Sequence, residues 1–302
     1  MSKDPIKHHF VTQAYLKRFS YDEKRVFVLR NNSRIIAPMR IDKICAENDF
    51  YSMFDGNKHR NTSIEKVFAR LEDEIPNKVF SLIPKDLLYP YRSGGIVLNS
   101  IQKTALVEAV LLQIVKSRLA REYSQSVVEP LFHEFLAEIK TKYKNKEDVE
   151  KQIEFFKQNK KIISDNAVVE SAIIPFTKNG ESDELRNNLQ RRNCNIFVNY
   201  TGEDLITSDN PILVGNHEGN IGKVFVYSLK DTDSILYYPL DSNHLVVLCT
   251  PERCGGLCYD EGLLTVLTQE NIDLIRKLNI AQYRQCKYYA ISRKEDTLRR
   301  IQ

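Results

Sequence analysis

Short runs of apolar residues near the start of the chain have the spacing of β-strands. Residues 25–41 (RVFVLRNNSRIIAPMRI) predict two short strands joined by the turn-prone Asn-Asn-Ser in their middle. The segment 47–54 (ENDFYSMF) predicts a third strand. The N-terminal part of the chain is therefore expected to contribute strands to a sheet.

The apolar spacing then changes to that of helices. In residues 61–75 the apolar side chains return to one helix face, so a helix is predicted there. Thr62 and Glu65 have the spacing of a capping box at its start, and Pro76 is expected to end it. A second helix is predicted over 99–123, apolar around most of its circumference and therefore buried, with its lysines and glutamines gathered on one side.

The last third of the chain is rich in β-branched and aromatic runs that are broken by Gly, Asn, Asp and Pro. These runs predict strands at 194–200, 204–208, 211–215, 223–229, 234–240 and 244–250. A final helix over 268–282 and a strand at 287–292 follow.

The order of these elements predicts the fold class. Strands, then helices, then more strands indicate a single α+β domain over residues 1–302. We expect a mostly antiparallel sheet built from N-terminal and C-terminal strands, because the connections between the later strands are too short for crossover helices. The sheet is expected to pack against a central helical segment at about 62–165, part of which resembles a lid. The charged stretch 125–165 is predicted to be either a solvated surface or a contact for a protein partner.

Composition and charge narrow the classes of protein. The 302 residues are 42% hydrophobic and 28% charged, which is globular composition, and the net charge of +4 is only mildly basic. The sequence contains no apolar run long enough to span a membrane, and the first twenty residues lack the apolar core of a signal peptide. We therefore expect a cytoplasmic protein.

Missing motifs and scattered cysteines exclude further classes. The sequence has no P-loop, no dinucleotide-binding glycine motif, no HExxH and no GxSxG, which disfavours nucleotide-dependent chemistry, zincin proteolysis and serine hydrolysis at a nucleophile elbow. Six scattered cysteines do not indicate a disulfide framework. Cys249, Cys254 and Cys258 supply half of a zinc-knuckle pattern, so free buried thiols are expected rather than a structural metal.

Two adjacent histidines near the start of the chain are candidates for a catalytic or metal-binding role. His8 and His9 are suited to proton transfer or metal binding, but neighbours in a strand point to opposite faces, so one of them is expected in a given site and the other in the core or in solvent. Glu65 and Glu72 are seven residues apart on one edge of a helix, where their carboxylates can converge on a cation. The alternative for Glu65 is a structural role in the capping box.

Two further loci carry polar residues in apolar surroundings. Glu108 falls within the apolar stripe of its helix, where an ionised carboxylate needs a cation that Arg118, nearly three turns away, is too distant to provide. Ser208, Asp209 and Asn210 lie between apolar strands on a turn that Pro211 makes rigid. A strand end of this kind is a common place for a functional site, and the alternative is an ordinary β-turn.

The segment HHFVTQAYLKRF, residues 8–19, resembles the opening of the uncharacterised family known as domain of unknown function 4238. Matching segments follow in order: DFY at 49–51, IE at 64–65, an arginine at 118, TSDNP at 207–211, YPLDSNHLVVL at 238–248 and LN at 278–279. One departure is Thr12, which stands where the family pattern has proline. The resemblance implies one polar site formed by His8, His9, Glu65, Arg118, Ser208, Asp209 and Asn210, and it names no reaction.

Two functions fit these residues. The first is a hydrolase, specifically a metal-dependent nuclease or phosphodiesterase of bacterial type with a role in phage defence. In it His8, Glu65 and Asp209 hold a divalent metal, and Arg118 neutralises the developing phosphate charge. The mildly basic charge and the lysine-rich stretch are compatible with a nucleic acid partner. The alternative is a non-enzymatic module that binds a ligand, or a protein partner through 125–165. Whether Glu65 or Glu108 is the functional acid stays open.

Overall fold

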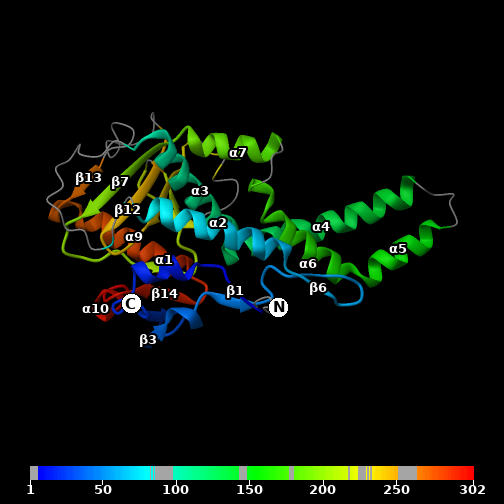
Figure 1. Ribbon diagram of the computed structural model, residues 1–302, viewed down its shortest axis with the longest axis horizontal. Helices are drawn as coiled ribbons and strands as arrows, with labels where there is room; N and C mark the ends of the chain where they lie inside the picture. The colour runs from blue at the N-terminus through cyan, green and yellow to red at the C-terminus, as the bar shows by residue number, and fades with distance from the viewer. Residues whose placement is uncertain are drawn as a thin grey trace.

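The computed structural model describes residues 6–81, 83, 85, 98–142, 148–176, 180–216, 218–223, 229, 231, 233–250 and 264–302, with the backbone alone at 74–78, 180–183, 223 and 264. The architecture is mixed α+β, as the sequence predicts (Figure 1). Mostly antiparallel sheets, which include N-terminal and C-terminal strands, pack against a central helical segment.

The N-terminal region consists of short strands around one helix and is followed by the helical segment. Its elements are β1 (Lys7–His9), α1 (Gln13–Arg18), β2 (Arg25–Arg30), β3 (Ile36–Arg40), η1 (Ile41–Lys43), β4 (Ala46–Asn48), β5 (Met53–Phe54) and β6 (Arg60–Asn61). The helical segment consists of α2 (Ser63–Val79), α3 (Ser100–Lys116), α4 (Arg118–Lys142), α5 (Val149–Gln158), α6 (Lys160–Ser171), η2 (Ile174–Phe176) and α7 (Gly180–Gln190). Of these, α4 and α5 extend away from the sheets (Figure 1).

The C-terminal region is rich in strands, and most of the described ones lie close to predicted positions. Most of the predicted strand at 223–229 lies outside the described residues. Its elements are β7 (Asn193–Asn199), β8 (Thr207–Ser208), β9 (Leu213–Gly215), β10 (Ile221–Lys223), β11 (Ile235–Pro239), β12 (His244–Cys249), β13 (Leu264–Leu267), η4 (Gln269–Asn271), α9 (Ile272–Gln285), β14 (Tyr289–Ser292) and α10 (Glu295–Arg299).

The strands form two main sheets, and the two ends of the chain meet in one of them. The four-stranded sheet has the order β3-β2-β14-β8, so the C-terminal β14 lies between an N-terminal strand and β8. The six-stranded sheet has the order β10-β9-β11-β12-β7-β13, in which only the pair of β13 and β7 is parallel. Two small ribbons, β1 with β4 and β5 with β6, complete the described strand pairings.

The helix α1 anchors the N-terminal segment to both sheets. Tyr15, Leu16 and Phe19 are at most 1% exposed, as expected from their apolar spacing. The Tyr15 hydroxyl donates to the Pro239 carbonyl at 2.6 Å and lies 2.8 Å from Thr207 Oγ1, so one side chain links β11 with β8. Buried hydrogen bonds of this kind fix where β1, directly before α1, is placed.

The predicted helix over 99–123 is in fact two helices. Its start is as predicted, with the capping box of Asn99 and Gln102 in place. At Ser117 the backbone turns extended (ψ 152°), and the Ser117 hydroxyl accepts a hydrogen bond from the Ala120 N–H at 3.1 Å. A serine in this position caps a new helix. Arg118 therefore begins α4 and does not end the apolar helix.

The end of α2 also differs from the prediction. The helix continues through Pro76 to Val79, although proline disfavours a helix interior. Nothing in the described structure explains why it continues.

The cysteines are mostly as expected. Cys45, Cys194 and Cys286 are buried free thiols. Cys249 is disulfide-bonded, so the expectation of a free thiol is wrong there. The other two cysteines of the zinc-like pattern, Cys254 and Cys258, lie outside the described residues.

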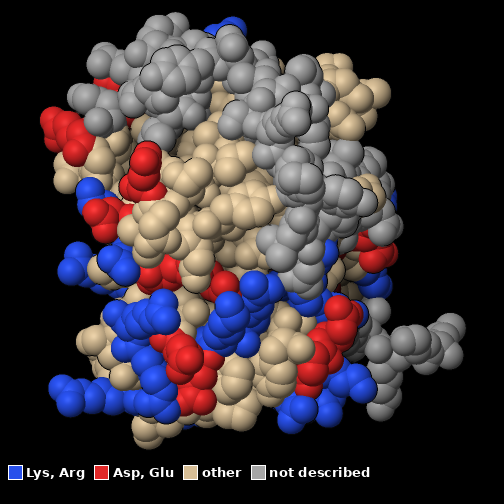
Figure 2. All heavy atoms as spheres, turned by 90° about the vertical axis from the view of Figure 1, so that its left-hand side faces the viewer, with Lys and Arg blue, Asp and Glu red and all other residues tan. Residues whose placement is uncertain are grey.

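Two surface properties bear on partners. Among the helices of the described ranges, none is long and apolar enough to cross a membrane. On the face shown in Figure 2, Lys and Arg side chains are interspersed with Asp and Glu over its lower part. The described part of this face is therefore not a continuous basic surface.

Candidate functional site

His8 lies at the centre of a buried polar cluster. The pairing of β1 with β4 sets His8 opposite Glu47, and the His8 side chain is fully buried. Its Nδ1 accepts a hydrogen bond from the Tyr51 N–H at 3.0 Å, and its ring stacks on that of Tyr51. Its Nε2 lies 3.2 Å from Arg60 Nη2. Both ring nitrogens of His8 lie against N–H groups of the protein. His8 is therefore better suited to a structural role in the core than to binding an external ligand.

Glu65 lies beside His8 in the first turn of α2. Its Oε2 is 3.9 Å from His8 Nδ1, and this oxygen is buried with no hydrogen-bond partner among the described residues. Burial raises the pKa of Glu65, and the charges of Lys116 and Arg60 lower it. A carboxyl group whose pKa is raised by burial is suited to donating a proton.

Lys116 is the deepest charged group of the cluster. It is the last residue of α3, where a cation is favoured by the helix dipole, and it is only 1% exposed. Its ammonium group donates to the Glu72 carboxylate and lies 5.2 Å from the ring centroids of Tyr51 and Phe68. Burial lowers the pKa of Lys116 to about 8, while the Glu65 charge raises it.

His9 is held as a neutral imidazole. Burial, followed by the charges of Lys7 and Lys116, lowers the pKa of His9 to about 4. The backbone of Ile41 hydrogen-bonds the ring, and Nε2 is buried with no partner in the described structure. A neutral imidazole has one nitrogen that accepts a hydrogen bond, so this ring can accept one from a ligand.

Of these groups, His9, Glu65 and Glu72 line one pocket between β1, α1 and α2. The pocket has a volume of about 310 Å³, and the residues that line it include Lys7, His9, Gln13, Glu65, Glu72 and Asp73. It is a polar pocket with carboxylates on the α2 side and a lysine and a histidine on the β1 side. Such an arrangement can bind a polar ligand and exchange protons with it.

The Ser-Asp-Asn turn is buried and holds the fold together. The Ser208 hydroxyl lies 2.6 Å from Gln282 Oε1 and accepts from the Asn210 N–H at 3.1 Å. The Asp209 carboxylate accepts from the N–H groups of Lys287 and Tyr288 at 2.9 Å and 2.6 Å. The turn thus joins α9 to the start of β14.

Asn210 and Arg118 connect this turn to α4. Asn210 Oδ1 accepts from the Leu119 N–H at 3.3 Å. The Arg118 guanidinium pairs with Glu47 and lies 4.8 Å from the ring centroid of Tyr288. Burial raises the pKa of Asp209 to about 6, whereas its backbone hydrogen bonds and the charge of Arg118 lower this pKa. Arg118 therefore lies between the His8 cluster and the turn.

The structure brings some of the expected residues together and not others. His8, His9 and Glu65 gather at one place, whereas Asp209 belongs to the buried turn. In the described part of the chain, no group of three or more His, Cys, Asp or Glu side chains is arranged to hold a metal ion. The triad of His8, Glu65 and Asp209 is therefore not assembled as a metal site.

Some residues of the cluster are not identifiable from the sequence, which also does not decide between Glu65 and Glu108 as the functional acid. The sequence pattern assigns no role to Tyr51 or Arg60. It places Gln113 and Lys116 on the polar side of their helix, yet both side chains are buried. A lysine at the end of an apolar helix is the one signal that marks Lys116. Glu108 is half-buried and does not line the pocket.

The fold and the site together define the class of this chain. It is a mixed α+β protein with a buried His-Glu-Lys cluster beside a polar pocket. The family described as "Protein of unknown function (DUF4238)" matches residues 7–296, and the chain belongs to this family. No curated protein and no solved structure matches the chain.

Proposed function

We propose that this protein is a hydrolase whose active site is the pocket between β1, α1 and α2. One observation carries the proposal. Glu65 Oε2 and His9 Nε2 are both buried without a hydrogen-bond partner among the described residues, and both residues line the same pocket. An unsatisfied buried polar atom costs ~1–3 kcal/mol, so two at one pocket favour a function over a purely structural role.

The chemistry of the two groups is complementary. Glu65, with its raised pKa, is suited to protonate a leaving group, and the neutral His9 is suited to accept a hydrogen bond from an attacking water. Lys116 is a positioning residue in this proposal, since its ammonium charge tunes the pKa of Glu65 from behind the pocket.

Phosphodiesters, including nucleic acids, are the substrate class we propose to test first. The carboxylates of Glu65 and Glu72 would repel a phosphate unless a cation accompanies it. Magnesium is commonly bound by one or two carboxylates together with substrate phosphates, which does not require a three-residue protein cage. Because Glu65 is the proton donor, Glu72 is the residue that would hold such an ion, and the role of the ion would be to neutralise phosphate charge.

The test compares two matched variants of the full chain. Hydrolysis of bis(p-nitrophenyl) phosphate and of labelled single- and double-stranded DNA and RNA is measured with Mg²⁺, with Mn²⁺ and with a chelator. We expect Glu65→Gln to lower kcat/KM by ~10²-fold or more, the usual contribution of a general acid. Glu108→Gln, on the neighbouring helix and outside the pocket, is expected to retain activity. Absence of hydrolysis by the wild type, or equal loss in both variants, would contradict the proposal.

We also propose that α4 binds a second copy of this chain, which is the non-enzymatic candidate. Val127, Leu131 and Phe135 are 38%, 53% and 44% exposed and recur every four residues, so they form an apolar stripe on one helix face. Such a stripe can bury itself against its own copy across a two-fold axis. Sedimentation equilibrium tests this: the wild type should dimerise and Leu131→Lys should not, whereas a monomeric wild type would contradict it.

A further inference from the structure

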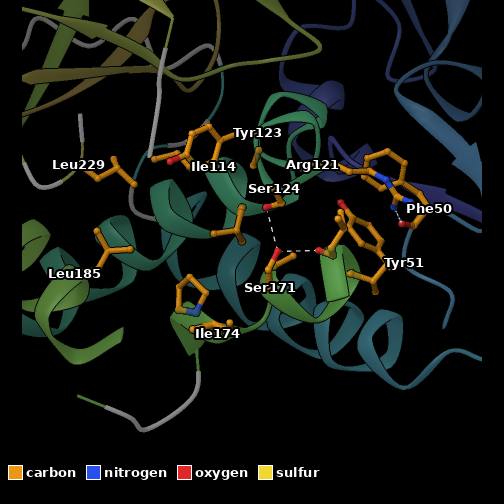
Figure 3. A pocket seen from close by; sticks show the side chains of 16 residues that line it. Phe50, Tyr51, Ile114, Arg121, Tyr123, Ser124, Ser171, Ile174, Leu185 and Leu229 are labelled. Carbon is orange, nitrogen blue, oxygen red and sulfur yellow. Dashed lines mark hydrogen bonds between the residues drawn. The ribbon is translucent and has the colours of Figure 1, made fainter. Parts of the chain in front are cut away.

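A second cavity lies between α3, α4 and α6 and is apolar. Its volume is about 290 Å³, and most of its lining is aliphatic or aromatic, including Ile114, Val168 and Leu185 (Figure 3). Ile174, which is 44% exposed, also lines it, so the cavity reaches the surface beside η2. Apolar cavities of this size are common binding sites for small molecules.

Few of the residues that line the cavity carry polar side-chain groups. Among the described residues that line it, Arg121 is the only charged one. Its Nη1 donates to the Phe50 carbonyl, and its guanidinium lies 4.6 Å from the Phe50 ring centroid (Figure 3). The guanidinium has five N–H donors, so donors remain for a ligand. The hydroxyls of Ser124 and Ser171 lie 3.0 Å apart, and the Ser171 hydroxyl also lies 2.8 Å from the Val168 carbonyl oxygen.

We propose that this cavity binds a small apolar molecule with one anionic end group, of the class of medium-chain carboxylates, with the carboxylate at Arg121. The volume equals that of about ten water molecules at ~30 Å³ each, which suits a ligand of about ten heavy atoms. The apolar lining selects the hydrocarbon part. The single guanidinium selects the charge of the end group.

The cavity adjoins the buried polar cluster around His8 through Tyr51. Tyr51 lines the cavity, its N–H holds His8 Nδ1, and its hydroxyl donates to the Lys116 carbonyl at 2.6 Å. A ligand in the cavity therefore packs against a residue that positions the polar cluster. The binding proposal itself does not depend on hydrolase activity.

Isothermal titration calorimetry of the full chain tests the proposal, with octanoate, 1-octanol and acetate as probes. We expect octanoate to bind with a submillimolar Kd, octanol at least tenfold more weakly, and acetate not measurably. Arg121→Gln should weaken octanoate at least tenfold and leave octanol nearly unchanged, because only the charged contact is lost.

A pocket-filling variant and a matched control locate the site. Ala172→Phe places a ring at the cavity wall and should abolish octanoate binding, whereas Glu170→Phe, exposed on the same helix and outside the cavity, should not. Leu185→Trp serves as a second filling variant if circular dichroism shows Ala172→Phe to be unfolded. Absence of octanoate binding, or binding that survives a folded filling variant, overturns the proposal. Equal affinity for octanol and octanoate overturns the anionic end group.

Discussion

Lys116→Met is the perturbation that tests the buried cluster most directly. In the folded chain, burial lowers the pKa of Lys116 from 10.5 to about 8. Between these pH values the unfolded chain binds the extra proton, so the free energy of unfolding must rise with pH. At ~1.4 kcal/mol per pH unit, the free energy of unfolding should rise by ~3 kcal/mol between pH 8 and pH 10.5. The attraction of Lys116 to Glu65 is already included in the lowered pKa. Methionine is similar in length and does not titrate, so the variant should lack this rise.

Urea denaturation at pH 7, 8, 9 and 10, followed by far-ultraviolet circular dichroism, measures the effect. Other lysines and tyrosines titrate in the same range, so the informative quantity is the difference between wild type and variant. Lys103→Met, at the other end of α3, is the matched control and should keep the wild-type slope. At pH 7 we expect Lys116→Met to be at least as stable as wild type, because Glu72 is 23% exposed and stays hydrated without its partner. An equal rise with pH in wild type and Lys116→Met would refute the reasoning.

Three further predictions follow from single contacts. Asp209→Ala should lower the free energy of unfolding by ~2–4 kcal/mol, because two backbone N–H groups just before β14 lose their acceptor; a loss below ~1 kcal/mol in urea denaturation would contradict this. The pKa of His9, followed by NMR of its ring protons, should lie near 4, and a value of 6 or above would show that the ring is hydrated. Tyr51→Phe should cost ~1–2 kcal/mol in the same denaturation assay through the unpaired Lys116 carbonyl, and an unchanged stability would show that water replaces the hydroxyl.

Much of the fold follows from local patterns in the sequence. The strands β2, β3, β7 and β11 lie where alternating or continuous apolar runs predict them, because strand periodicity is a local property. The break at Ser117 was missed for the same reason. The apolar spacing continues past Ser117 into α4. The helix cap at Ser117 can be identified only when the packing of the two helices is known.

The site was less accessible to local reasoning. The approach of His8 and Glu65 to 3.9 Å accords with the resemblance to the family, and no local pattern indicates it. An aspartate at the end of a strand has the same sequence pattern whether it faces a ligand or caps a neighbouring strand. Asp209 is of the second kind, since it accepts hydrogen bonds from the N–H groups of Lys287 and Tyr288. Lys116 was overlooked because a polar side of a helix is normally assigned to solvent.

The two pockets have a common physical origin in the junction of α3 and α4. Because α3 ends at Lys116, its last ammonium turns inward to Glu72, while the carbonyl of the same residue receives the Tyr51 hydroxyl. Because α4 begins at once, Arg121 lies one turn further along and reaches the Phe50 carbonyl. Tyr51 therefore contacts the end of α3, and Phe50 contacts the first turn of α4. A change at this break, such as extending α3 through Ser117, would displace groups of the polar pocket and of the apolar cavity together.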